Sequence, residues 1–289
     1  RTPIVFSGGL FSNLFGWEEN NGLAKQFAQE GRDTWEIEMT GGPNTECSTC
    51  PNYKYEDLTD YYWPALIAGV EKYSGENVIQ YVGHSNGCRV ALDSLKNWSA
   101  AGKSNAGYYF NTNTGEYLLT NLAANPVDIF FGLGCPGVFN GTSRFTDQVA
   151  NFKDDLLKYL DGSINHPKQK DVGRQLQANP AEKFFLGQNR ISANTMKDYL
   201  NFVTDSIDKV PGQTFSINKI YLIAGDNYPF KDSTGQKGGD DDGFVLTIDT
   251  RQIFNSITKN FGNVSIFHVN HPELVTDKKV HKYIKEVLK

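Results

Sequence analysis

The 289-residue sequence predicts an α/β fold in which a mostly parallel central sheet is flanked by helices. Apolar runs rich in β-branched and aromatic residues alternate with stretches of helical periodicity, which is the pattern of a parallel sheet with crossover helices. The block 143–212 interrupts this alternation, because it carries several short helical patterns and no strong strand. We therefore predict a core formed by residues 1–142 and 213–289, with a helical cap, 143–212, inserted over the sheet.

In the first half of the chain, turn residues mark where elements begin and end. Gly31 is a plausible C-terminal stop for the first helix, and Pro64 is expected to kink or restart the second. Asn113-Thr114-Gly115 predicts a hairpin that decorates the sheet rather than joining it. In chain order we expect strand 3–9, helix 17–31, strand 33–41, helix 55–75, strand 77–83, helix 86–98, hairpin 107–119 and strand 126–134.

The second half resumes the alternation after the cap. The apolar run "INKIYLIAGD" predicts a strand, and an acidic, glycine-rich loop follows it. Beyond that loop the periodicity changes from helical to alternating and back to helical. The expected elements are strand 217–226, helix 249–262, strand 263–270 and a terminal helix that ends with 278–289.

Composition describes a globular protein with a mildly acidic surface. The chain has 33 acidic and 28 basic residues and is 39% hydrophobic, so nucleic acid is an unexpected partner. No apolar run is long enough to predict a membrane span. The chain starts at Arg1 without a methionine, which indicates that a leader was removed or that a longer protein was cut. We expect a secreted or cell-surface protein.

Four cysteines are too few for a disulfide scaffold. Only Cys47 and Cys50 lie close together in sequence, in the loop segment "ECSTC". A single CxxC lacks the second pair that a zinc site needs. It therefore leaves open a loop-closing disulfide, free thiols or a redox role.

The segment "QYVGHSNGCR", residues 80–89, places Ser85 between Gly83 and Gly87 at the point where a strand gives way to a helix. Side chains at the two glycine positions would collide with neighbouring backbone in so tight a turn. The serine hydroxyl then projects from a strained conformation, and the first turn of the helix offers unpaired N–H groups to an anion. This context predicts a nucleophile elbow.

At this point the chain resembles the α/β-hydrolase superfamily, and more narrowly its bacterial true lipases. "VFSGGLF" is similar to their oxyanion loop, with Ser7 where histidine is usual, and "VGHSNG" matches their elbow. "GLGCPGVFNG", residues 132–141, resembles a further glycine- and proline-containing segment. "DDGFV" and "NHPELV" resemble the segments that carry the acid and the base. The resemblance implies an α/β-hydrolase fold and a Ser-His-Asp triad.

Serine needs an adjacent base, and imidazole is the usual one near neutral pH. His271 follows the last strand in a loop, with the chain order that this fold requires. His84 is expected to point away from Ser85 and to pack beside the turn, whereas His268 is expected to be a packed or edge residue of the strand. His166 in the cap and His281 on the terminal helix are expected to be exposed.

Two aspartates could orient His271. Asp226 ends the strand "IYLIAG", and Asp242 stands immediately before a glycine in "GGDDDGFV". The lipase resemblance favours Asp242, and Asp226 stays the alternative. In the resembling lipases an aspartate near position 226 and an acid two residues after the base bind a structural calcium, which implies Asp226 and Glu273 here. Carboxylate oxygens suit calcium.

The oxyanion hole is expected to use the backbone N–H of Asn86 and of Gly9, with Leu10 as the alternative to Gly9. The residues that follow, including Leu10 and Phe11, either line the acyl site or pack in the core. In the cap, apolar residues such as Phe184, Phe185 and Phe202 are expected to line the acyl site in one or two cases. The cap could also contact a lipid interface.

These residues predict a serine carboxylic-ester hydrolase, a lipase or esterase, that works through an acyl-enzyme without an organic cofactor. Its substrate would be a small-molecule or lipid ester. Two alternatives stay open. One is a thioester, amide or polyester hydrolase with the same triad, and the other is a catalytically silent binding protein of the same fold.

Overall fold

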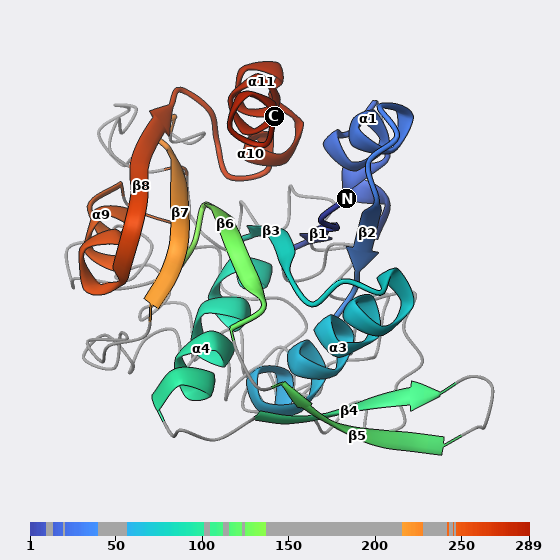
Figure 1. Ribbon diagram of the computed structural model, residues 1–289. Coiled ribbons are helices and arrows are strands. Elements are labelled where there is room, and N and C mark those ends of the chain that lie inside the picture. The colour runs from blue at the N-terminus through green and yellow to red at the C-terminus, as the bar shows by residue number, and fades with distance from the viewer. Residues whose placement is uncertain are drawn as a thin grey trace, which may run out of the picture.

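The structure is a computed structural model that describes residues 1–9, 14–19, 21–39, 57–100, 105–111, 116–122, 125–136, 216–227, 242, 245 and 247–289. Its centre is a six-stranded sheet with the strand order β2-β1-β3-β6-β7-β8, in which every neighbouring pair is parallel (Figure 1). The strands are β1 Ile4–Ser7, β2 Thr34–Ile37, β3 Ile79–His84, β6 Val127–Leu133, β7 Ser216–Gly225 and β8 Thr258–Phe267. The predicted parallel sheet is confirmed.

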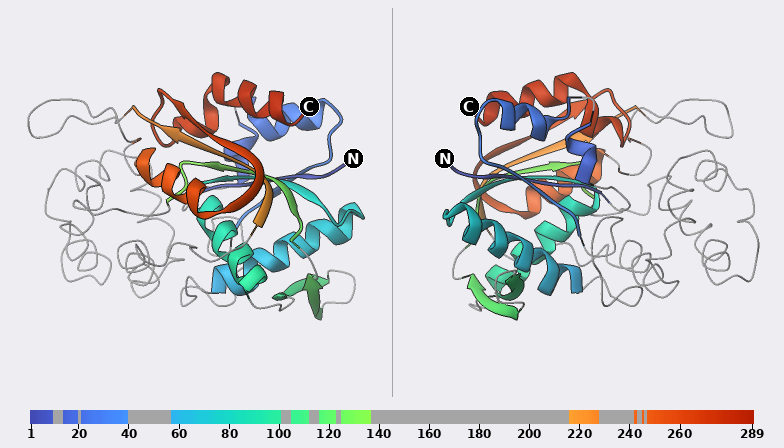
Figure 2. Two further views of the ribbon diagram at one scale, coloured as in Figure 1. Left: turned by 60° about the vertical axis from the view of Figure 1, so that its left-hand side comes forward. Right: turned by 90° about the vertical axis from the view of Figure 1, so that its right-hand side faces the viewer.

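Helices cover both faces of this sheet and give three layers (Figure 2). One face carries α1, Leu23–Gln29, together with α10, Glu273–Thr276, and α11, Lys278–Val287. The other carries α3, Trp63–Ser74, α4, Asn86–Ala100, and α9, Thr247–Ser256. Each face has its own cluster of buried apolar side chains. The strands are therefore apolar on both sides, as the continuous runs in the sequence predict.

Register brings the site-bearing ends of the strands together. Ser7 at the end of β1 pairs with Gly83 near the end of β3, and Gly83 pairs with Gly132 near the end of β6. Because parallel strands all point the same way, the residues that follow them collect at one edge of the sheet. Ligand sites of open α/β sheets lie at this edge.

The predicted hairpin is confirmed, both in its position along the chain and in standing apart from the central sheet. β4, Asn105–Asn111, and β5, Glu116–Leu122, form an antiparallel pair of their own. This pair lies beside α3 and does not extend the six-stranded sheet (Figure 1).

The boundary between the last two core elements differs from the prediction. Helix 249–262 and strand 263–270 were expected, but α9 ends at Ser256 and β8 already begins at Thr258. Gly262, the last residue of the expected helix, lies inside β8. A Cβ there would lie 1.9 Å from the Ile220 carbonyl oxygen, so glycine permits the close approach of two strands.

Helix 55–75 is interrupted as Pro64 suggests. Residues 58–62 form a π-helical turn, and α3 restarts at Trp63 with Pro64 in its first turn. The cap 143–212 and Cys47 with Cys50 lie outside the described residues. In the part of the chain that the structure describes, no helix has the length and apolar character needed to cross a membrane.

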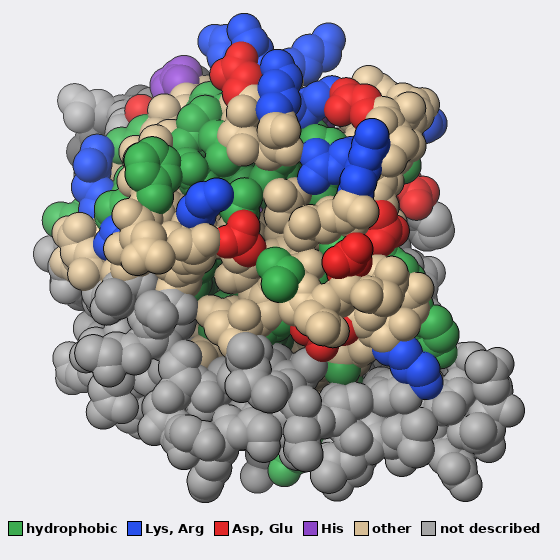
Figure 3. Space-filling view, in the orientation of Figure 1, with side chains coloured by type: hydrophobic (Ala, Val, Ile, Leu, Met, Phe, Trp, Pro, Cys, Tyr) green, Lys and Arg blue, Asp and Glu red, His purple; other side chains and the backbone are tan. Residues whose placement is uncertain are grey.

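Lysine and arginine side chains gather at the top of the space-filling view, over α1 and α11 (Figure 3). Four lysines lie on α11, and some of them face acids: Lys285 pairs with Glu30, and Lys282 lies 3.8 Å from Glu286. This basic surface is therefore partly neutralised.

Candidate active site

Ser85 occupies a sharp turn between β3 and α4. Its φ is +51°, a left-handed backbone conformation that is uncommon for a residue other than glycine. The Ser85 N–H donates to the Leu133 carbonyl oxygen at the end of β6, 2.8 Å away. Strain of this kind persists only where the surrounding structure holds it, and it is common at functional sites.

The two glycines of the motif allow this turn to form. A Cβ on Gly83 would lie 2.8 Å from the backbone nitrogen of Cys88. A Cβ on Gly87 would lie 2.6 Å from the Gly8 carbonyl oxygen and from Ser7 Oγ. The elbow therefore lies directly against the end of β1, and a side chain at Gly87 would force them apart. A side chain at Gly83 would instead collide with Tyr81 and with the first turn of α4.

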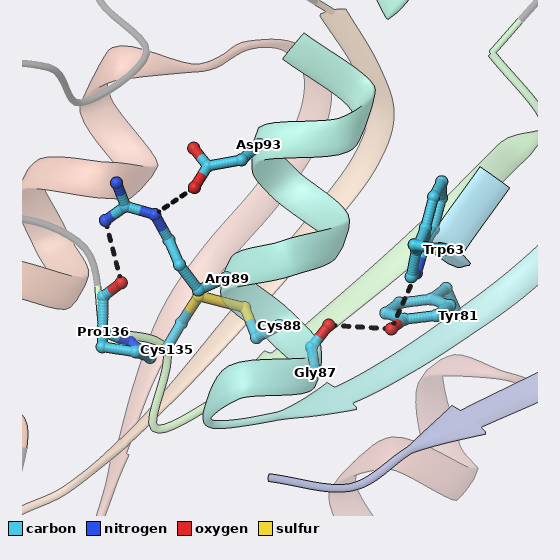
Figure 4. The surroundings of a disulfide bond; sticks show 8 residues. All are labelled: Trp63, Tyr81, Gly87, Cys88, Arg89, Asp93, Cys135 and Pro136. Atoms are coloured by element: carbon cyan, nitrogen blue, oxygen red, sulfur yellow. Dashed lines mark hydrogen bonds and ion pairs between the residues drawn. A yellow bond between two sulfur atoms is a disulfide. The ribbon is translucent and has the colours of Figure 1, made fainter. Parts of the chain in front are cut away.

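A buried aromatic pair, Trp63 and Tyr81, is hydrogen-bonded to the turn (Figure 4). The Tyr81 hydroxyl donates to the Gly87 carbonyl oxygen at 2.8 Å and accepts from the Trp63 indole nitrogen at 3.1 Å. Burial raises the pKa of Tyr81, so the hydroxyl keeps the proton that it donates.

A disulfide joins the first turn of α4 to the loop after β6. Cys88 and Cys135 are 47 residues apart in sequence but have Cα atoms 5.4 Å apart (Figure 4). Arg89 adds a second tie, because its Nη1 donates to the Pro136 carbonyl oxygen at 3.0 Å while its Nε pairs with Asp93. Sequence reasoning missed this bond, since only Cys47 and Cys50 are close in sequence.

His271 and Asp242 form a buried pair. His271 Nδ1 lies 2.7 Å from Asp242 Oδ2, and the Asp242 side chain is fully buried. Asp242 Oδ1 accepts from the Val245 N–H at 2.8 Å, so both carboxylate oxygens are engaged. A carboxylate can only accept, so Nδ1 carries the hydrogen of a neutral His271, and Nε2 is left as the basic nitrogen.

The main chain of His271 is fixed on both sides. Its N–H donates to the Asp242 carbonyl oxygen at 2.9 Å, and its carbonyl oxygen lies 3.0 Å from His84 Nε2. Asn270 and Glu273 close the loop reciprocally, each accepting on its side chain the backbone N–H of the other. These bonds hold the loop that carries the His271 ring.

The His271 ring and the elbow meet at the end of β6. A Cβ on Gly134 would lie 2.8 Å from both Cε1 and Nδ1 of His271. Gly134 directly follows Leu133, whose carbonyl oxygen accepts from Ser85. The strand end thus supports the serine turn with one residue and the imidazole with the next.

The two residues expected to donate to an oxyanion flank the elbow. Asn86 is buried at the first position of α4, and Gly9 is half-buried two residues after β1. Gly87 contacts the Ser7-Gly8 backbone, which brings the loop after β1 to the first turn of α4. Leu10 and Phe11 lie outside the described residues.

Asp226 contacts a different histidine. Its Oδ1 lies 2.9 Å from His268 Nδ1, and the pair is open to solvent. Glu273, the other predicted calcium ligand, is engaged with Asn270. Within the described ranges, no three histidine, cysteine, aspartate or glutamate residues are grouped as a metal would require. The calcium site stays a prediction that these contacts do not support.

One of the histidine expectations is wrong, because His281 is buried rather than exposed. Its Nε2 donates to the Val275 carbonyl oxygen at 2.6 Å, between α10 and α11. His268 directly follows β8, the edge strand of the sheet, and its exposed side chain fits the edge position rather than the packed one. His84 packs beside the turn as expected, but sequence reasoning missed its bond to His271. His166 lies outside the described residues.

Comparison with known proteins finds likeness in structure rather than in sequence. No family model matches the chain, and no relative was found among curated proteins. An esterase from Exiguobacterium antarcticum is similar, with a TM-score of 0.56 and 13% identity, over 100% of this chain and 92% of that one. Mouse alpha/beta hydrolase domain-containing protein 10 gives a TM-score of 0.52 and 11% identity, over 99% of this chain and 87% of that one.

A third similar structure is Est816, described as an N-acyl homoserine lactone degrading enzyme. It gives a TM-score of 0.54 and 13% identity, over 99% of this chain and 93% of the other. Identities this low establish a shared fold and not a shared substrate. The parallel sheet, its two helical layers and these likenesses together show that the chain has the α/β-hydrolase fold.

Proposed function

We propose that this protein is a serine hydrolase that cleaves carboxylic esters through an acyl-enzyme. The observation that carries the proposal is the buried His271–Asp242 pair beside the end of β6, where the strained Ser85 turn is also held. Within the described residues, the serine, the aspartate and the histidine follow one another along the chain in the order that this fold uses for catalysis, and each comes after the end of a strand.

In the proposed reaction Ser85 Oγ attacks the ester carbonyl carbon while its proton moves to His271 Nε2. The tetrahedral intermediate then expels the alcohol, which takes that proton from the imidazolium. Water repeats the sequence on the acyl-enzyme and releases the acid and the free serine. Asp242 stabilises the imidazolium in both halves. The reaction needs no organic cofactor.

Backbone N–H groups of Gly9 and Asn86 are proposed to hold the oxyanion, with Leu10 as the alternative to Gly9. Their support is the contact between the loop after β1 and the first turn of α4, whose N-terminus favours negative charge. Leu10 and Phe11 are proposed to line the acyl site, and the cap to choose among acyl chains.

A secreted or cell-surface location is also a proposal. The Cys88–Cys135 bond supports it, because structural disulfides are rare where thioredoxin and glutathione keep thiols reduced. Counting thiols in the denatured, unreduced protein tests the bond. Detection of both Cys88 and Cys135 as free thiols would remove this support.

Ester turnover tests the function. We expect p-nitrophenyl esters from acetyl to palmitoyl to be hydrolysed with a maximum at one chain length. Ser85→Ala should abolish turnover without unfolding the protein, and Ser74→Ala at the end of α3 is the matched control. Thioester, anilide, polyester and acyl-homoserine lactone substrates extend the panel, the last because one structural neighbour degrades such lactones. Near-normal turnover by Ser85→Ala would contradict the proposal.

A further inference from the structure

His84, the residue before Ser85, is a buried histidine that the proposed reaction does not use. Its Nε2 lies 3.0 Å from the main-chain oxygen of His271, and the two ring centroids are 4.6 Å apart with planes 43° apart. The two residues are 187 positions apart in sequence. Their contact is thus a direct link between the elbow and the loop that carries the base.

The partner of His84 determines its tautomer. A carbonyl oxygen only accepts, so His84 Nε2 must carry a hydrogen and donate it. Burial lowers the pKa of His84 well below 6.5, and the neighbouring His271 lowers it further. His84 is therefore a neutral donor, with the hydrogen on Nε2 and none on Nδ1.

We propose that His84 is a positioning residue that fixes the His271 loop through the His271 carbonyl oxygen. The inference rests on the proposed function and adds a residue to that site. The His271 N–H is already bound to the Asp242 carbonyl oxygen. Because His84 donates to the His271 carbonyl oxygen, both polar main-chain atoms of His271 are hydrogen-bonded. The loop that carries the His271 ring therefore cannot shift without breaking one of these bonds.

The neutrality of this donor matters for the chemistry. His271 becomes an imidazolium during each half-reaction, and a cation 4.6 Å away would oppose that charge. A lysine or arginine at position 84 could supply a hydrogen bond but would add that repulsion. A buried imidazole supplies the bond without the charge.

Two substitutions separate the hydrogen bond from the packing. His84→Gln keeps a donor, because glutamine Nε2 is the same number of bonds from Cα as histidine Nε2. His84→Leu has a similar size and no donor. We expect His84→Leu to lower kcat about 10- to 100-fold, as displacements of about 1 Å do. Its KM should change less than about threefold, since His84 is buried and outside the proposed acyl site. His84→Gln should recover most of the lost kcat.

His281→Leu is the matched control. His281 is also buried, and its Nε2 also donates to a main-chain carbonyl, that of Val275, on the face formed by α10 and α11. It should lose thermal stability as His84→Leu does, but keep the wild-type kcat. A kcat for His84→Leu equal to that of the wild type would overturn the proposal. So would equal kcat losses in His84→Leu and His281→Leu.

Nuclear magnetic resonance of protein labelled with ¹⁵N in its histidines gives a readout that does not depend on turnover. His84 should show the Nε2–H tautomer from about pH 8 to pH 5. The low-field proton between His271 Nδ1 and Asp242 should weaken or exchange faster in His84→Leu, but not in His281→Leu. If that proton changes while no substrate is cleaved, the positioning stands and the ester hydrolase proposal fails. If esters are cleaved through Ser85 and the proton and kcat are unchanged in His84→Leu, the positioning fails alone.

Discussion

Among the residues that the structure describes, two histidine–aspartate pairs lie at the same edge of the sheet, with similar contact distances but very different exposure. His271 and Asp242 are 2.7 Å apart, and His268 and Asp226 are 2.9 Å apart. The His271 side chain is 9% exposed, whereas that of His268 is 78% exposed. The two histidines are only three positions apart along the chain.

This difference shows that contact distance does not identify a catalytic pair. An exposed pair is solvated and screened, and contributes little to stability. A buried carboxylate needs partners for its oxygens, and Asp242 has them in His271 and in the Val245 N–H. The His271 carbonyl oxygen also contacts His84 of the elbow, and the His271 ring lies close against Gly134 at the end of β6. Burial and these ties separate the two pairs.

The largest expected effect comes from removing the buried charge. Asp242→Asn keeps the shape of the side chain but favours the wrong tautomer of His271, and should lower kcat by about 10⁴, as the same exchange does in serine proteases. Steady-state kinetics on the preferred ester measure this loss. Asp226→Asn is the control. A collapsed kcat in a well-folded Asp226→Asn beside a near-normal Asp242→Asn would reverse the assignment of the acid.

The next largest effect should come from displacing the His271 imidazole with a side chain at position 134. Gly134→Ala would place a Cβ 2.8 Å from His271 at a residue whose φ is +54°, and the displaced ring should lower kcat about 100-fold. Gly75→Ala is the matched control, because Gly75 has a φ of +76° but open space around it. It should cost about 1–2 kcal/mol of stability and leave kcat unchanged. Equal kcat values for the two variants would contradict the placement of the ring.

A smaller effect concerns His84, which should make the free energy of unfolding depend on pH. The pKa of His84 is lowered in the folded protein, so below about pH 6.5 the unfolded chain binds a proton there that the folded chain does not. The free energy of unfolding should therefore fall as pH drops from about 6.5, and fall less in His84→Gln. Urea unfolding near pH 7.5 and near pH 5 measures both slopes. Equal slopes would mean that His84 takes up its proton without unfolding.

The smallest effect should come from the exposed pair. His268→Ala and Asp226→Asn should each change kcat by less than about twofold and stability by less than about 1 kcal/mol. Kinetics and thermal melting check both values. If a chelator lowered the melting temperature of the wild type but not that of Asp226→Asn, that result would support the calcium prediction.

Local sequence patterns predicted what depends on neighbouring residues. The elbow follows from two glycines around a serine between a strand and a helix, and the restart of α3 follows from Pro64. The parallel sheet follows from the alternation of patterns. Asp242 was favoured through a family resemblance, since the spacing of residues alone left Asp226 open.

Contacts between distant segments could not be predicted from a single sequence. Cys88 and Cys135, and His84 and His271, are brought together only by the order of the strands in the sheet. His281 was expected to be exposed because its helix is rich in lysine, but it lies on the buried face of that helix. Gly262 shows the same limit, since a glycine that stops a helix and one that admits a neighbouring strand have the same local sequence signal.

The rate at which a fluorophosphonate labels Ser85 tests most directly whether the buried pair, and not the exposed one, serves the nucleophile. The probe should add once to the wild type, at Ser85, and not to Ser85→Ala. His268→Ala should be labelled at the wild-type rate, whereas His271→Ala should be labelled at least about 100-fold more slowly because the general base is lost. Equal labelling rates in the two histidine variants, or a label on any residue other than Ser85, would contradict the account.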